Sequence, residues 1–184
     1  MILENDNRYL APKYRFFSNY FGWNYSMFFT RNSFFGKWLR AHNSVVKIND
    51  DLFLHGGISY GFYQQKMSIE DINKEVRYKL DNYLVNDKDP LFSMSGPFWY
   101  RGYLWTSTEF KKITEEELDE VLAFYQVKHI IVGHTISEQI QSVYNNKVIA
   151  LSASFCEPGE RIYGLLIRNG NYFRVSGKEQ KKLF

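Results

Sequence analysis

Residues 52–57 read Leu-Phe-Leu-His-Gly-Gly, and residues 130–134 read Ile-Ile-Val-Gly-His. Each is a short apolar run bounded by glycine, which is the pattern of a buried strand. In open α/β architectures, ligands gather beyond the carboxyl ends of such strands. We therefore expect His55 and His134 to leave a rigid sheet edge and point into a site, a setting that suits a metal ligand.

The composition indicates one globular domain. The 184 residues are 45% hydrophobic and 18% aromatic, which is enough for one substantial core. No apolar stretch approaches the roughly 20 residues that cross a bilayer, and no signal-peptide pattern opens the chain, so a soluble, cytoplasmic protein is the default expectation. The single cysteine, Cys156, has no disulfide or Cys-x-x-Cys partner and is expected to be an ordinary thiol.

The charge pattern argues against a nucleic-acid partner. The net charge is +3, but the basic residues are scattered, and the densest run is the tail with Lys178, Lys181 and Lys182. Nucleic-acid binders usually concentrate basic charge on one face together with stacking aromatic side chains. We therefore expect no nucleic-acid partner.

Helix and strand signals alternate around the two opening stretches. Capping residues and apolar spacings of three and four predict three helices. The first begins after Asn32 or Ser33 and places four apolar side chains on one face: Phe34, Phe35, Trp38 and Leu39. The second runs from Ser68 to about Leu84, and the third from Thr114 to about Tyr125. Strands are predicted at 45–48, 52–55 and 128–132, followed by two hairpins, 139–151 and 162–175. In the second hairpin, Asn169-Gly170 suits a type I′ turn. This order of elements predicts one mixed helix-and-sheet domain whose C-terminal layer is mostly β.

Other polar residues of interest have structural interpretations. His42 is expected near the end of its helix, where a cation favours the dipole, and His129 at the start of a strand without chemistry. Asp50 and Asp51 are interpreted first as turn residues.

Three motifs in order carry a resemblance to a known family. They are residues 52–59 (LFLHGGIS), 97–103 (PFWYRGY) and 131–135 (IVGHT), with supporting matches at 36–40 and 165–170. Together they resemble the second half of a calcineurin-like metallophosphoesterase, and within that superfamily the phosphoprotein-phosphatase branch, specifically bacterial Shewanella-like phosphatases. The resemblance covers nearly all of the chain.

The resemblance implies an α/β (α+β) fold, the calcineurin-like β-sandwich flanked by helices. Residues 1–184 would form a single partial domain, the C-terminal portion of that fold. The complete enzyme would hold two divalent metal ions (Mn, Fe or Zn), one of them coordinated by both His55 and His134. Arg101 would resemble the phosphate-binding arginine, and the cleft walls would include Trp99, Tyr100 and Tyr103.

Each of these residues also has a structural alternative. Either histidine alone is more often a polar core residue or a strand-end cap than a ligand. The structural alternative for Arg101, less favoured than phosphate contact, is a salt bridge or stacking on Trp99, Tyr100 or Tyr103.

The chain also departs from the family pattern. The motifs Gly-Asp-x-His-Gly, Gly-Asp-x-x-Asp and Gly-Asn-His-Glu, which in the family supply most metal ligands and the proton-donating histidine, are absent from the 184 residues. Residues 1–6 resemble the segment that directly follows Gly-Asn-His-Glu, so the N-terminal half of the fold is expected to be missing. A smaller departure lies in residues 148–154, where family members often carry an aspartate near Ser152.

The leading functional expectation is the C-terminal part of a metal-dependent phosphatase acting on phosphomonoesters of proteins or small molecules. Two imidazoles are too few for a dinuclear centre, so we expect partial or no metal occupancy and little or no activity in the isolated chain. A dinucleoside polyphosphate hydrolase and a non-catalytic remnant or binding module remain alternatives. Surfaces exposed by truncation predict self-association or pairing with the missing half, and any export signal would lie in that missing part.

Overall fold

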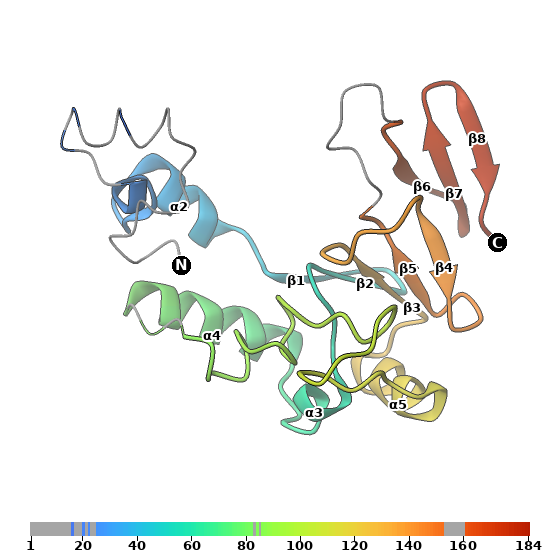
Figure 1. Cartoon of the computed structure of the whole chain (residues 1–184), viewed down its shortest axis with the longest axis horizontal. Coiled ribbons are helices and arrows are strands. Elements are labelled where there is room, and N and C mark those ends of the chain that lie inside the picture. The colour runs from blue at the N-terminus through green and yellow to red at the C-terminus, as the bar shows by residue number, and fades with distance from the viewer. Residues whose placement is uncertain are drawn as a thin grey trace. The chain divides into compact units, whose positions relative to one another are not determined.

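The computed structural model describes residues 25–82, 84, 86–152 and 161–184, together with residues 16, 20 and 22 (Figure 1). It divides into two compact units, residues 1–43 with 73–85 (unit 1) and residues 44–72 with 86–184 (unit 2), and each unit is described by itself. Cys156, residues 1–6 and the end of the 148–154 stretch lie outside the described residues. Within the described part, no helix has the length and apolar character to span a membrane.

Unit 2 is built on a five-stranded mixed sheet with the order β1-β2-β3-β5-β4. Its strands are β1 (Val45–Ile48), β2 (Asp51–Leu54), β3 (His129–Val132), β4 (Gln141–Val143) and β5 (Val148–Ala150). The central strands β2, β3 and β5 run parallel, and β1 and β4 pair antiparallel at the two edges. Leu54 is in register with Val132, so the two predicted strands end side by side and their histidines follow at one sheet edge.

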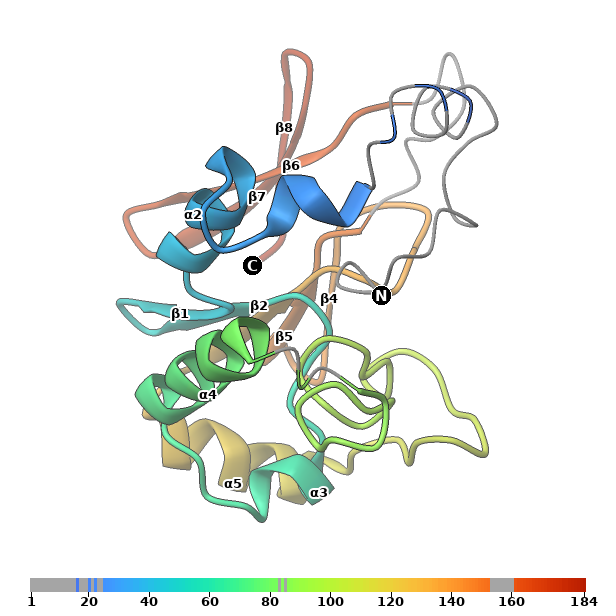
Figure 2. The same ribbon diagram turned by 90° about the vertical axis from the view of Figure 1, so that its left-hand side faces the viewer.

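The two faces of this sheet are covered differently. Helices α3 (Tyr60–Tyr63) and α5 (Glu115–Tyr125) lie on one side, and a second sheet lies on the other (Figures 1 and 2). The second sheet has the order β6 (Gly164–Arg168), β7 (Asn171–Ser176), β8 (Glu179–Lys182). Between the two sheets lies a buried cluster of Ile131, Ile140, Ile149 and Tyr172. The predicted fold class, a β-sandwich flanked by helices, is confirmed.

Local capping signals account for the helix boundaries. The capping box of Thr114 and Glu117 begins α5, and Gln126, with a left-handed backbone, ends it. Ser68 and Asp71 exchange hydrogen bonds at the start of α4 (Ile69–Asp81), as predicted. This helix ends three residues before the predicted Leu84.

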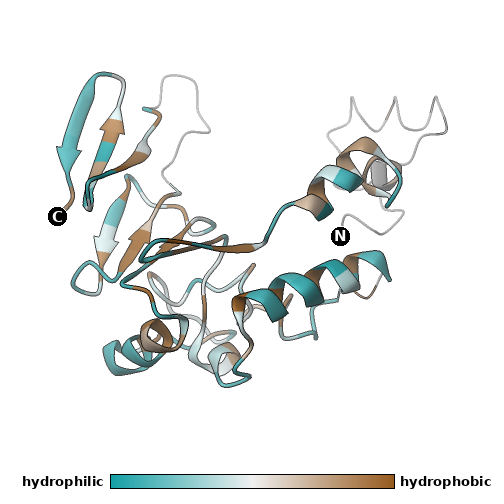
Figure 3. Ribbon diagram, turned by 180° about the vertical axis from the view of Figure 1, so that it is seen from behind, coloured by the Kyte–Doolittle hydropathy of each residue, from teal (hydrophilic) through white to brown (hydrophobic). Residues whose placement is uncertain are grey.

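The C-terminal hairpins form where predicted, but one strand was missed. Asn169 and Gly170 both have positive φ angles, 51° and 69°, as a type I′ turn requires. The missed strand is β8, whose sequence Glu-Gln-Lys-Lys has no apolar alternation and is drawn hydrophilic in Figure 3. All four of its residues are exposed, and charged side chains on an edge strand disfavour pairing with other chains.

The interpretation of Asp51 as a turn residue is wrong, whereas His129 begins the strand β3 as predicted. Asp51 lies in β2 with 5% of its surface exposed, opposite His129 in the register of β2 and β3. Its Oδ1 atom is 2.9 Å from Nδ1 of His129 and accepts a hydrogen bond of 2.6 Å from the hydroxyl of Tyr172. These three side chains form a polar cluster at the margin of the sandwich interior.

Unit 1 contains η2 (Tyr25–Phe29), α2 (Phe34–Ala41) and α4 from Asn73 onward. Ser33 caps α2 as predicted, accepting a hydrogen bond from the Gly36 amide, and His42 is its C-cap. The aromatic residues predicted to share a face of this helix are exposed, from 50% for Phe35 to 78% for Phe34.

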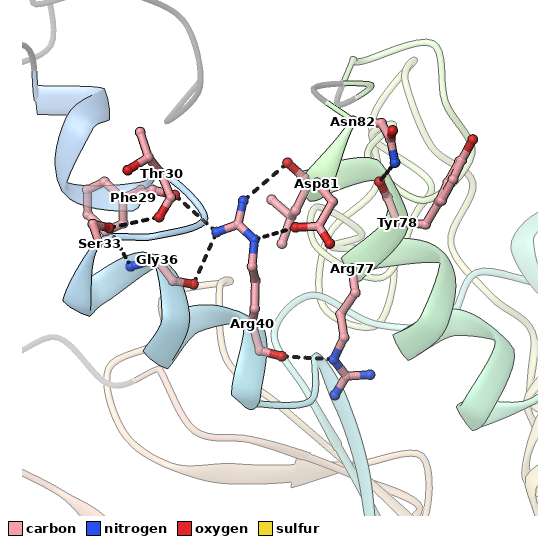
Figure 4. Close-up of polar contacts among 10 residues, drawn as sticks. Phe29, Thr30, Ser33, Gly36, Arg40, Arg77, Tyr78, Asp81 and Asn82 are labelled. Carbon is pink, nitrogen blue, oxygen red and sulfur yellow. Dashed lines mark hydrogen bonds and ion pairs between the residues drawn. The ribbon is translucent and has the colours of Figure 1, made fainter.

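Arg40 holds unit 1 together (Figure 4). Its Nε atom pairs with Asp81 at 2.6 Å, and its two terminal nitrogens donate to the backbone carbonyls of Phe29, Gly36 and Leu80. The planar guanidinium can donate to all of these acceptors at once, whereas the ammonium group of a lysine could not. One side chain thus joins η2, α2 and α4.

Candidate metal and phosphate site

Adjacent strand ends bring His55 and His134 together. Their ring centroids are 4.8 Å apart, and the amide of Gly133 donates to the carbonyl of His55 at 2.9 Å. His134 has a φ of +58°, in the left-handed region that residues other than glycine rarely adopt. Backbone strain of this kind gathers at functional sites.

The surroundings keep both imidazoles neutral. Burial lowers the pKa of His55, and the nearby Arg101 lowers it further. Burial lowers the pKa of His134 to about 4, with smaller contributions from Arg101 and His55. At neutral pH both rings therefore present nitrogen lone pairs, which is the form that binds metal ions.

One of those nitrogens lacks any other partner. Nε2 of His134 is buried and has no hydrogen-bond partner in the described part of the chain. Buried polar atoms are seldom left unsatisfied, because each costs the full desolvation penalty of the group. An unsatisfied imidazole nitrogen beside a second neutral imidazole fits two ligand positions on one divalent ion.

The same residues do not complete a metal centre. Among the described residues, no group of three or more His, Cys, Asp or Glu side chains could hold a metal ion. Two metal ions held close together need carboxylate oxygens to share between them. The described part of the chain offers imidazole ligands for one ion and no carboxylate bridge.

Arg101 lies beside the histidine pair. One of its terminal nitrogens donates to the carbonyl of His134 at 3.1 Å, and its guanidinium carbon lies 5.2 Å from the centre of the Trp105 ring. The ring contact is with Trp105 and not with the neighbouring aromatic residues considered from sequence. No acidic side chain of the described residues pairs with Arg101, so its charge is available to an anion.

The three predicted cleft residues are placed differently from one another. The Trp99 ring packs edge-on against His134 with 5.2 Å between centroids. Tyr100 and Tyr103 are buried, 1% and 3% exposed, and their hydroxyls donate to the backbone carbonyls of Lys111 and Ile58. These two tyrosines lie behind the site, and only Trp99 contacts a site residue.

The two glycines after His55 explain how residues 97–101 reach the histidines. The amides of Gly56 and Gly57 both donate to the carbonyl of Pro97, at 2.8 and 3.2 Å. A Cβ atom on Gly56 would lie 2.7 Å from the backbone of Phe98, and one on Gly57 would lie 2.6 Å from the Tyr103 ring. The Gly-Gly pair is therefore a docking surface for the segment that carries Trp99 and Arg101.

Sequence reasoning missed an open groove next to these residues. Its volume is about 460 Å³, and it is lined by Leu104, Trp105, Ile136, Ser137, Glu138, Gln139 and Gln141. The only signal in the sequence was proximity, because both walls follow Arg101 and His134 within a few residues.

Comparisons with known proteins agree with this architecture. Residues 4–138 match the calcineurin-like phosphoesterase family. Over 146 residues the chain is 32% identical to Shewanella-like protein phosphatase 1 of Plasmodium berghei (strain Anka), an alignment that covers 75% of this chain and 40% of that protein.

Solved structures extend the similarity to the whole chain. The crystal structure of a cold-active protein-tyrosine phosphatase from a psychrophilic Shewanella species matches with a TM-score of 0.86 and 32% identity, over 100% of this chain and 56% of that one. A second structure, of a cold-active protein tyrosine phosphatase at 1.1 Å, matches with a TM-score of 0.84 over 100% of this chain and 54% of that one. The chain thus spans about half the length of these relatives. It belongs to the calcineurin-like phosphoesterase family.

Proposed function

We propose that this chain supplies one metal-binding histidine pair and a phosphate-binding arginine to a metal-dependent phosphatase that hydrolyses phosphomonoesters on proteins. The unsatisfied Nε2 atom of His134, next to His55 and Arg101, is the observation that carries the proposal. The relatives named as protein phosphatases and protein-tyrosine phosphatases support the substrate class.

The roles of the residues follow from their chemistry. Arg101 is a permanent, planar cation with no carboxylate partner among the described residues, so it binds a phosphate dianion through a charge-assisted pair of hydrogen bonds. His55 and His134 hold the ion through neutral nitrogens. When bound, divalent ions stabilise the attacking and leaving oxygens of a phosphoryl transfer.

The chain alone is expected to be inactive. A two-metal mechanism needs bridging carboxylates, and the described residues contain no suitable cluster. In this proposal the further ligands come from a polypeptide segment that carries the three motifs absent from these 184 residues.

Metal binding by the purified chain tests the histidine pair. Calorimetric titration with Mn²⁺ and Zn²⁺ should show one weak site that is lost in His55→Asn and in His134→Ala. His42→Asn is the matched control, because His42 is an exposed histidine at a helix end. Equal binding by all three variants and the parent chain would contradict the assignment.

An assay of turnover tests the claim of incompleteness. The chain is incubated with a generic aryl phosphate and Mn²⁺, and no turnover above background is expected. Robust turnover that disappears in His55→Asn would show that the chain is a complete enzyme.

A further inference from the structure

We propose that Tyr103 is a positioning residue that couples the phosphate-binding Arg101 to the metal-binding histidines. Its hydroxyl closes a ring of hydrogen bonds through the three segments that carry Arg101, His55 and His134. The inference rests on the proposed function, in which Arg101 holds the phosphate and the histidines hold the ion. It adds a residue that contacts neither group and acts through the backbone.

Two links of the ring join the histidines to each other and to Arg101. The amide of Gly133 donates to the carbonyl of His55 at 2.9 Å. The guanidinium of Arg101 donates to the carbonyl of His134 at 3.1 Å. The second link runs through a long side chain with several rotatable bonds, so it does not by itself fix the backbone that carries Arg101.

The third link is made by the Tyr103 hydroxyl, two residues after Arg101. This hydroxyl accepts a hydrogen bond from the Ile58 amide at 3.0 Å and donates one to the Ile58 carbonyl at 3.1 Å. On the other side of Arg101, the carbonyl of Pro97 accepts hydrogen bonds from the two glycine amides that follow His55. The segment with Arg101 is thus fixed at both ends to the loop that follows His55.

The hydroxyl is the sole partner that the described residues offer to the backbone of Ile58. Ile58 is fully buried and Tyr103 is 3% exposed, so water does not readily replace the hydroxyl. Burial raises the pKa of Tyr103 above its ordinary value, so the hydroxyl keeps the proton that it donates. Buried backbone groups are seldom left without partners, because each costs its full desolvation penalty. Loss of the hydroxyl should therefore displace this loop relative to the Arg101 segment.

Packing holds the aromatic ring of Tyr103 independently of its hydroxyl. The ring lies edge-on to Tyr100 and Tyr144, with 5.4 and 6.4 Å between centroids. It also lies so close to Gly57 that a Cβ atom there would be 2.6 Å from it. A phenylalanine would keep these contacts, so Tyr103→Phe isolates the contribution of the hydroxyl.

The histidine pair does not depend on this hydroxyl. His55 and His134 follow the paired strands β2 and β3, whose ladder fixes where the two imidazoles lie. Tyr103→Phe should therefore leave the metal affinity of the pair unchanged and alter only the position of Arg101 relative to the ion. An ion and a phosphate that bind next to each other tighten each other's binding, and such coupling is reciprocal.

Calorimetry on the full chain measures this coupling without requiring turnover. The Kd of inorganic phosphate is determined with and without Mn²⁺, and the Kd of Mn²⁺ is determined alone. In the parent chain, Mn²⁺ should tighten phosphate binding roughly tenfold. In Tyr103→Phe, this tightening should fall below about threefold, while the Kd of Mn²⁺ alone stays within about twofold of the parent value.

Tyr100→Phe is the matched control. Tyr100 is as buried as Tyr103, at 1% exposed, and its hydroxyl donates to the carbonyl of Lys111, which lies outside the ring of hydrogen bonds. This variant should lose stability and keep the coupling. Thermal melts set the assay temperature below the lowest midpoint, so that every variant is folded when binding is measured.

Hydrogen exchange in the parent chain tests the same link without a variant. The Ile58 amide donates to the Tyr103 hydroxyl, and its exchange reports how firmly the ring of hydrogen bonds is closed. Exchange should slow most when Zn²⁺ and phosphate are bound together. Equal slowing by Zn²⁺ alone would overturn the coupling role of Tyr103.

The outcomes separate the positioning role from the proposed function. Unchanged coupling in Tyr103→Phe, or an equal loss in Tyr100→Phe, would overturn the positioning role alone. Phosphate binding that depends on Arg101 but not on Mn²⁺ would also overturn only this role. Absence of phosphate binding, or binding unaffected by Arg101→Ala, would overturn the proposed function and the positioning role with it.

Discussion

Replacing Tyr172 by phenylalanine should destabilise the chain through the loss of one hydrogen bond. The Tyr172 hydroxyl donates to Oδ1 of Asp51 at 2.6 Å and lies 2.9 Å from Nδ1 of His129. Tyr172 and Asp51 are each only 5% exposed, so water cannot readily replace the hydroxyl. The aromatic ring, stacked on Phe184 at 4.6 Å, stays in the variant.

The size of the loss in stability follows from the hydrogen bond that the Asp51 carboxylate loses. A hydrogen bond to a charged group contributes about 1.5–3 kcal/mol, and a buried acceptor left without its donor pays a desolvation cost in the same range. His129 remains beside the carboxylate and limits the loss. We therefore expect the free energy of unfolding to fall by about 2 kcal/mol, a change of roughly 30-fold in the unfolding constant.

Urea unfolding followed by circular dichroism measures this loss. The midpoint should fall while the slope of the transition stays constant, because the variant exposes the same surface on unfolding. Tyr163→Phe is the control, since the Tyr163 hydroxyl has no hydrogen bond to a described residue, and it should change stability by less than about 0.5 kcal/mol. Equal midpoints for the two variants would refute the role assigned to the cluster.

The pH dependence gives an independent check. Burial, followed by the hydrogen bond to Asp51, raises the pKa of Tyr172 above its ordinary value. The native state thus keeps a proton that the unfolded chain releases above about pH 10, so this contribution to stability is complete below pH 10 and is lost as the pH rises further. Tyr172→Phe should lose less stability between pH 9 and 11 than the parent chain. An identical decline would contradict the assignment.

Three further predictions address other parts of the molecule. In the metal-free chain, the ring protons of His134 should shift in NMR spectra only as the pH falls toward 4, because burial lowers its pKa; a midpoint near 6 would contradict this. Gly57→Ala should cost about 1–3 kcal/mol in thermal melts because its Cβ would meet the Tyr103 ring at 2.6 Å. Gly61→Ala, whose Cβ would make an ordinary contact of 4.0 Å with the Ser59 hydroxyl, should be neutral or mildly stabilising. Arg40→Ala should speed hydrogen exchange in α2, because four acceptors lose their donor. Unchanged exchange would show that the contacts of Arg40 do not stabilise this helix.

The sequence predicted features that depend on neighbours along the chain. The capping residues of α2, α4 and α5 act within four residues, and the type I′ turn needs only Asn169 and Gly170. The meeting of His55 and His134 was predictable because two parallel strands that end in glycine-bounded runs share one sheet edge.

Features that join distant segments were not predictable. Asp51 was interpreted as a turn residue because its partner Tyr172 lies 121 positions away. The strand β8 carries no apolar alternation and forms by pairing with β7. Tyr100 and Tyr103 have the residue type of cleft walls, and only their burial shows that they support the Gly-Gly segment from behind.

Because of the left-handed backbone at residue 134, protein stability and metal binding favour different residues at this position. A non-glycine residue in this conformation costs about 1–3 kcal/mol, which glycine would avoid at the expense of greater freedom in the unfolded chain. A screen for thermal stability alone would therefore favour His134→Gly, while a screen for metal binding would reject it. The two screens, run on one library of variants at residue 134, would rank glycine and histidine in opposite order.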